Sequence, residues 1–135
     1  MTVAQRNASR TYNEAAVMTA TPGRLVLMLY AGAVRFLTRA EAMYRNGDRL
    51  GGLTSVNRAI AIVDELNVTL DMNQGDVAHR LRSIYLFAKR ELLQATVKCD
   101  PDRVATINDL IRELHTAWEE IVEREGALTP EPLAS

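Results

Sequence analysis

Cysteine is nearly absent from this sequence, because Cys99 is the only one in 135 residues. The chain therefore forms no intrachain disulfide and no zinc site built on several cysteines. Aromatic residues are also few, at 5% of the chain, whereas Leu, Ala, Val and Ile abound. Because sheets favour aromatic and β-branched residues, this balance favours helices over sheets.

An excess of charge of either sign is absent too, since the formal net charge is −1. Such a chain has no global field to attract nucleic acid or anionic lipid, so we expect no nucleic-acid partner. The longest apolar run, from Leu25 to Leu37, is interrupted by Arg35 and is too short for stable membrane insertion. No apolar signal segment is visible near the N-terminus, so we expect a cytosolic (cytoplasmic) protein.

Apolar residues recur every three or four positions in four segments, which predicts four amphipathic helices. Thr21-Pro22 and Asp100-Pro101 each combine a capping side chain with a proline at the first helical position. Asn46-Gly47 is a stop signal, as are the breakers NQGD at 73–76 and KCDP at 98–101, and Asp76 is placed to cap the third helix. The start of the second helix falls between Asp48 and Thr54.

The apolar rows of these helices predict the core. The expected inner rows, in chain order, are Leu25, Met28/Leu29, Gly32, Phe36, Ala40 and Met43; Leu53, Val56, Ile60, Val63, Asn67 and Leu70; Val77, Leu81, Ile84, Ala88, Leu92 and Ala95; and Val104, Ile107, Ile111, Leu114, Trp118 and Ile121.

Short connections place neighbouring helices antiparallel. The sequence therefore predicts an all-α fold, an antiparallel up-down four-helix bundle over residues 21–126. Residues 1–20 show no sustained period and are expected to form a mobile N-terminal arm. Residues 127–135 contain two prolines and are expected to be a disordered tail.

Residues that carry catalytic or metal chemistry are scarce. His115 and Glu119 share a helix face, but no second such pair exists to complete a metal site in a bundle. Cys99 has no positioned base in view and is interpreted as an inert side chain. The glycine-rich stretch GDRLGGLTS at 47–55 lacks the Lys-Ser/Thr of a phosphate loop, so loop flexibility explains it better. We expect no enzyme, no metal and no cofactor.

One spacing is similar to that of histidine phosphotransfer domains, which are also four-helix bundles. His79 is followed by an apolar residue, Leu81, and a basic one, Arg82. An exposed neutral imidazole can accept a phosphoryl group, and nearby cations stabilise it. However, Ser83 stands where that family has glycine, and His79 falls in the first turn of its helix. This remains the alternative function, beside a helical adaptor of unknown client.

The first two helices carry a second apolar row: Val26, Tyr30, Val34 and Leu37 in the first, Ala59, Ile62 and Leu66 in the second. An apolar arc wider than about 100° indicates a helix buried on more than one side. Either the arm folds over these helices, or a groove accepts a partner helix. Asn67 lies among apolar residues, where it either bonds within the bundle or bonds a partner's backbone.

Three stretches carry a family resemblance: TATPGRLVLMLYAGAVRFL at 19–37, AIVDELNVTLD at 61–71 and IRELHTAW at 111–118. In this order and spacing, from Tyr12 to about Ile121, the chain resembles the flagellin-specific export chaperones, the FliS family. Ser9 stands where members often carry an aromatic residue, and Arg24 where an acidic residue is frequent.

The resemblance implies a cytosolic chaperone that binds the C-terminal segment of flagellin, prevents premature polymerisation and delivers flagellin to the export gate proteins. It also implies that the arm, around Tyr12 and Val17, shields the groove when cargo is absent. Resemblance and position together predict the partner-binding residues Ile62, Leu66, Asn67, Leu70, Leu81 and Tyr85, with Leu29 and Tyr30 as weaker candidates. On this basis Leu66→Asp is expected to abolish flagellin binding.

Overall fold

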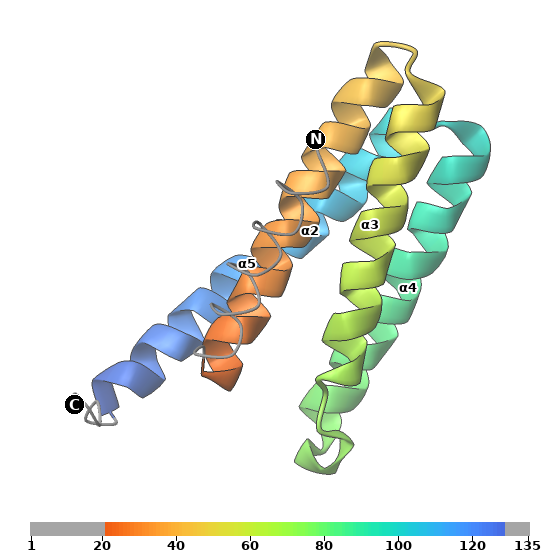
Figure 1. Cartoon of the computed structure of the whole chain (residues 1–135). Helices are drawn as coiled ribbons and strands as arrows, with labels where there is room; N and C mark the ends of the chain where they lie inside the picture. The colour runs from red at the N-terminus through yellow and green to blue at the C-terminus, as the bar shows by residue number, and fades with distance from the viewer. Residues whose placement is uncertain (1–20, 129–135) are drawn as a thin grey trace, which may run out of the picture.

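The computed structural model describes residues 21–128, with side chains described for residues 21–124. This part of the chain consists of helices α2 (Pro22–Arg45), α3 (Arg49–Val68), α4 (Asp76–Lys98) and α5 (Pro101–Leu128), with a short 3₁₀ helix, η1 (Met72–Gln74), between α3 and α4. The predicted up-down four-helix bundle is confirmed, with α2 and α4 each packed between α3 and α5 (Figure 1). Tyr12 and Val17 of the predicted arm lie outside the described residues. Helix α5 runs two residues past the predicted end of the bundle at Gly126.

Most helices begin and end where the capping residues in the sequence predict. Thr21 caps α2, since its hydroxyl accepts a hydrogen bond from the Arg24 N–H at 3.3 Å, and Pro22 is the first helical residue. Gly47 has φ +80° in the turn after α2, where a residue without Cβ is favoured. The Asp48 carboxylate then caps α3 by accepting from the Gly51 N–H at 2.9 Å.

The third helix starts differently from the prediction. Asp76 is the first residue of α4 and not its cap; Gly75, at φ +77°, occupies the cap position without a side-chain hydrogen bond. The fourth helix follows the prediction, because the Asp100 carboxylate accepts from the N–H groups of Asp102 and Arg103 at 3.1 and 3.2 Å.

The glycines of the GDRLGGLTS stretch are not a flexible loop, which corrects the expectation. Gly51 and Gly52 both lie in the first turns of α3, and Gly52 is buried. A Cβ atom at Gly52 would overlap the ring of Tyr44. The pair therefore allows α2 and α3 to approach closely beside their turn, a reason that local sequence does not reveal.

The core combines both apolar rows of α2, so the expected inner row was wrong in part. Tyr30 and Leu37, which belong to the second apolar row, are completely buried. In the expected inner row, Leu29 and Phe36 are half-buried and Met28 is exposed. The reason is that α2 packs on two neighbours, α3 and α5. The inner row of α5 is correct except at its outer end, where Ile121 is exposed. The inner row of α4 is correct in part: Ala88, Leu92 and Ala95 are buried, but Val77 is exposed, Ile84 is only half-buried, and Tyr85 from outside the row is in the core.

Candidate functional site

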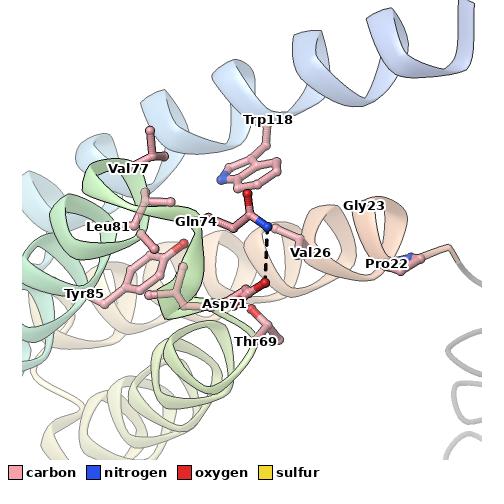
Figure 2. A pocket seen from close by; sticks show the side chains of 12 residues that line it. Pro22, Gly23, Val26, Thr69, Asp71, Gln74, Val77, Leu81, Tyr85 and Trp118 are labelled. Carbon is pink, nitrogen blue, oxygen red and sulfur yellow. Dashed lines mark hydrogen bonds between the residues drawn. The ribbon is translucent and has the colours of Figure 1, made fainter. Parts of the chain in front are cut away.

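An apolar pocket lies at the end of the bundle where α2 begins and α3 ends (Figure 2). Its volume is about 290 Å³. Helices α2, α4 and α5 and the connection between α3 and α4 contribute to it. The lining residues are Pro22, Gly23, Val26, Thr69, Leu70, Asp71, Gln74, Val77, Ala78, Leu81, Tyr85 and Trp118. We call this the end pocket.

Local turn chemistry builds one wall of the end pocket. The Thr69 hydroxyl donates to the Leu66 carbonyl at 2.6 Å, where α3 ends. The Asp71 carboxylate then accepts from the Asn73 N–H at 3.0 Å and from the Gln74 side-chain amide at 3.2 Å. These hydrogen bonds on the exposed Asp71 lower the pKa of its carboxyl, the backbone bond from Asn73 having the larger effect. The wall is thus a small polar turn beside an apolar interior.

The opposite walls are apolar and come from α2, α4 and α5. Figure 2 shows Leu81 and Tyr85 on α4, Val26 on α2 and the indole of Trp118 on α5 around the space that Gln74 enters. Val77, one turn before Leu81, is 64% exposed. Exposed apolar side chains beside a pocket can bury more surface when a ligand binds, which favours an apolar ligand.

A buried tyrosine pair lies directly behind the pocket. The hydroxyls of Tyr30 and Tyr85 are hydrogen-bonded to each other, and the His115 ring stacks on Tyr30 with 6.1 Å between centroids. Burial raises the pKa of the Tyr30 phenol well above its ordinary value, and its contact with Tyr85 raises that pKa further. Burial likewise raises the pKa of Tyr85. Both phenols therefore stay neutral and fix α2 against α4.

The eight predicted partner-binding residues fall into three places. Leu70, Leu81 and Tyr85 line the end pocket, and Tyr30 supports it from behind. Leu66 is 0% exposed in the core, close in sequence to the pocket but not on its surface. The other two apolar candidates, Leu29 on α2 and Ile62 on α3, are half-buried and packed against the core.

Asn67 is half-buried on α3, one turn before Leu70. Its side-chain carbonyl oxygen is buried and accepts no hydrogen bond from the described residues. A buried acceptor without a donor costs free energy, so the hydrogen-bonding capacity of the Asn67 side chain is not fully used within the described residues.

Several pocket residues were not predicted as contacts, above all Trp118, Val26 and Val77. Each was assigned to an inner or second apolar row, where its role was packing. Trp118 carried a usable signal, because it is the only tryptophan of the chain and lies at the open end of α5. The pocket as a whole joins residues nearly a hundred positions apart, which no local pattern reveals.

Metal binding and phosphoryl transfer at His79 were the other chemistries considered from the sequence. Within residues 21–124, no group of three His, Cys, Asp or Glu side chains is placed to hold a metal ion. His79 is exposed in the first turn of α4, as the sequence suggested, and its backbone carbonyl accepts from the Ser83 hydroxyl at 3.1 Å. Among the described helices, none is long and apolar enough to cross a membrane.

Known proteins are similar to this sequence over most of its length. The model of the family FliS, flagellar protein FliS, matches residues 5–125. The flagellar secretion chaperone FliS of Bacillus subtilis is 31% identical over 123 residues, covering 91% of this chain and 92% of its own. The protein of the same name from Salmonella typhimurium is 34% identical and covers 80% of this chain and 82% of its own. The one from Campylobacter jejuni is 35% identical and covers 78% of this chain and 83% of its own.

The family match at residues 5–125 includes every residue of the end pocket, all of α2, α3 and α4, and α5 up to residue 125. The chain belongs to the FliS family of flagellar secretion chaperones.

Proposed function

We propose that this chaperone binds the C-terminal segment of flagellin in the cytosol, prevents its premature polymerisation and delivers it to the flagellar export gate proteins. The single observation that carries the proposal is the end pocket, an apolar site on the surface of a FliS-family bundle. A terminal segment that folds only on partner surfaces can place an apolar side chain there, and such binding is reversible because ordering the segment costs free energy.

Of the predicted contacts, Leu70 and Leu81 touch the flagellin segment directly in this proposal, and the buried Tyr85 closes the pocket from the core side. Val77 and Trp118 join them at the pocket rim. Leu29, Ile62 and Asn67 extend the contact along α2 and α3. Leu66 and Tyr30 act from the core by keeping the pocket in shape.

Calorimetry between the full chain and the C-terminal segment of flagellin from the same genome tests this proposal. We expect one-to-one binding that is lost when the segment is truncated. Trp118 reports occupancy independently, because the chaperone has no other tryptophan and its indole lines the pocket. Absence of binding heat and of any change in Trp118 emission would falsify the proposal.

A matched pair of variants locates the site. Val77→Gln changes an exposed valine at the pocket, and Val97→Gln changes one on the same helix that is 75% exposed and does not line the pocket. Losing the burial of one valine costs about 1.5 kcal/mol, or roughly tenfold in affinity. We expect that loss for Val77→Gln alone. Equal affinities of the two variants place the contact elsewhere.

The role of residues 1–20 is part of the same proposal. We propose that the arm around Tyr12 and Val17 shields the apolar site until flagellin displaces it. Removal of the residues before Val17 should then raise flagellin affinity or promote self-association. Unchanged affinity together with an unchanged oligomeric state contradicts a shielding arm.

A further inference from the structure

A second pocket, unrelated to the end pocket, lies on the outer side of the α2–α3 hairpin near its turn. Its volume is about 460 Å³. Its lining residues are Phe36, Arg39, Met43, Asp48, Leu50, Gly51, Thr54, Ser55 and Arg58. We call it the arginine pocket, because two guanidinium groups dominate its charge.

The two arginines converge on one aromatic ring from different helices. The Arg39 guanidinium carbon lies 5.8 Å from the centre of the Phe36 ring, and that of Arg58 lies 5.6 Å from the same centre. Attraction between a cation and the ring's π-electrons holds each group in place. Since Arg39 belongs to α2 and Arg58 to α3, the packing of the hairpin itself fixes the pair.

Neither guanidinium is neutralised by the part of the chain that the structure describes. Arg39 and Arg58 form no salt bridge and no side-chain hydrogen bond with residues 21–124, whereas Arg45 and Arg103 each form salt bridges there. Both arginines line the same pocket, so an anion bound there is attracted by two positive charges. Their planar donor groups match the geometry of a carboxylate or a phosphate group.

The other lining residues select the kind of anion. Asp48 contributes one negative charge, so a singly charged ligand is better tolerated than a dianion such as phosphate. Phe36, Met43 and the 74% exposed Leu50 offer apolar surface beside the charges. A free inorganic anion cannot use that surface, but a glutamate within an amphipathic peptide segment can cover it.

We propose that the arginine pocket binds a glutamate or aspartate carboxylate of an acidic, amphipathic peptide segment of a partner protein. Arg39 and Arg58 hold the carboxylate, and Phe36 keeps both guanidinium groups in position. The pocket adds an electrostatic contact to a chaperone whose end pocket is apolar. It does not depend on flagellin being the client, because the site is defined by charge and geometry alone.

The peptide Ac-Gln-Leu-Glu-Gln-Leu-Gln-NH2, which carries a single carboxylate, and its counterpart with glutamine in place of that glutamate test the proposal on the full chain. The side-chain Nε–H signals of Arg39 and Arg58 are followed by NMR during titration. We expect saturable shifts of both signals with the glutamate peptide, at least tenfold weaker binding of the glutamine peptide, and weaker binding as salt is added. Equal binding of both peptides, or no shift of either signal, overturns the proposal.

Variants separate a specific site from general attraction to positive charge. Arg39→Gln/Arg58→Gln removes the pocket's cations, and Arg82→Gln/Arg90→Gln removes two exposed cations of α4 that do not line it. We expect at least a tenfold loss of peptide affinity for the first pair and less than twofold for the second. Similar losses for both pairs overturn the proposal. Arg58→Lys should give an intermediate loss, because lysine keeps the charge but not the planar donor pair.

Inorganic phosphate at matched ionic strength is the last control. The argument from Asp48 and the apolar lining predicts that phosphate binds at least tenfold more weakly than the glutamate peptide. If phosphate binds as tightly and shifts the same arginine signals, the pocket is a site for free anions and the peptide proposal is wrong.

Discussion

The two ends of the bundle are built differently. At the end where α2 turns into α3, Gly52 packs against the Tyr44 ring, and Arg45 forms a 3.0 Å salt bridge with Asp102 at the start of α5. At the other end, the helices leave the end pocket open, and the first turn of α4 beside it presents the exposed Val77.

The difference separates stability from binding within one small fold. Close backbone contact and capping at the turn end fix how the helices cross. The pocket end keeps apolar surface that its own chain does not cover, at a cost in stability that the rest of the core offsets. Substitutions in the Gly52–Tyr44 contact and in the core should therefore change the free energy of unfolding, whereas substitutions at the rim of the end pocket should change binding.

The largest expected effect comes from Leu66→Asp. Leu66 is 0% exposed, so the variant places an unpaired carboxylate in the core at a cost of about 4 kcal/mol or more. We expect loss of the helical signal or a melting temperature far below that of the wild type, measured by circular dichroism. Loss of flagellin binding in this variant would therefore report unfolding and not contact.

The exposed neighbour Val68 supplies the control. It is 76% exposed, so Val68→Asp should change the free energy of unfolding by no more than about 0.5 kcal/mol. A Leu66→Asp protein that melts like Val68→Asp would show that Leu66 is not a core residue.

The next largest effect is expected for Tyr85→Phe, which tests the support behind the end pocket. The substitution leaves the buried Tyr30 hydroxyl without its partner, at a cost of about 1–3 kcal/mol in urea unfolding. Tyr44→Phe is the matched control, because the Tyr44 hydroxyl is buried without a hydrogen-bond partner in the described residues. We expect that control to be neutral or stabilising, and equal losses in both variants contradict the role of the tyrosine pair.

The same pair predicts a loss of stability at high pH. Burial raises the pKa of Tyr30 and of Tyr85, so the folded chain keeps protons that the unfolded chain releases near pH 10. The stabilisation is therefore complete below pH 10 and decreases above it, by about 1.4 kcal/mol per pH unit for each tyrosine that stays neutral. Urea unfolding at pH 8, 10 and 11 measures the slope, which should be smaller in Tyr85→Phe.

Gly52→Ala tests the turn end and should have a smaller effect. The added methyl group overlaps the Tyr44 ring, which costs about 1–3 kcal/mol, but alanine regains up to about 1 kcal/mol through its helix propensity. We expect a net destabilisation of about 1 kcal/mol. In a Tyr44→Leu background the penalty should shrink or reverse, and a penalty that is unchanged there means that the ring is not its cause.

The sequence predicted what local patterns encode. The caps at Thr21 and Asp100 depend on side chains within three residues, and both are correct. The inner row of α2 was wrong because both of its rows are apolar, and only the positions of α3 and α5 decide which row is central. Gly52 was misread for a related reason, since its partner Tyr44 lies on another helix.

The candidate site shows the same limit more strongly. Family resemblance directed attention to Leu70, Leu81 and Tyr85, and these residues do share one pocket. Resemblance did not separate them from Leu66, which lies in the core. Periodicity assigned Trp118 to the core. The apolar repeat identifies the face of α5 that packs inward, but not the position along the helix where that face becomes accessible to solvent.

The smallest expected effect concerns the turn that borders the end pocket. Hydrogen bonds from Asn73 and Gln74 lower the pKa of Asp71 below its ordinary value of 3.8. Because the folded-state pKa is depressed, these hydrogen bonds stabilise the turn above pH 3.8 and are lost as pH falls through the folded-state value.

The Asn73 amide signal, followed by NMR from pH 6 to pH 2, should therefore titrate with a midpoint below 3.8. The urea-unfolded chain is the control, where the midpoint should return to the ordinary value of about 3.8. In Asp71→Asn the titration should disappear while the melting temperature at pH 7 stays nearly unchanged, because the exposed turn contributes to the pocket wall and not to the core. A midpoint that is identical in folded and unfolded chains would mean that this wall of the pocket is not held by Asp71.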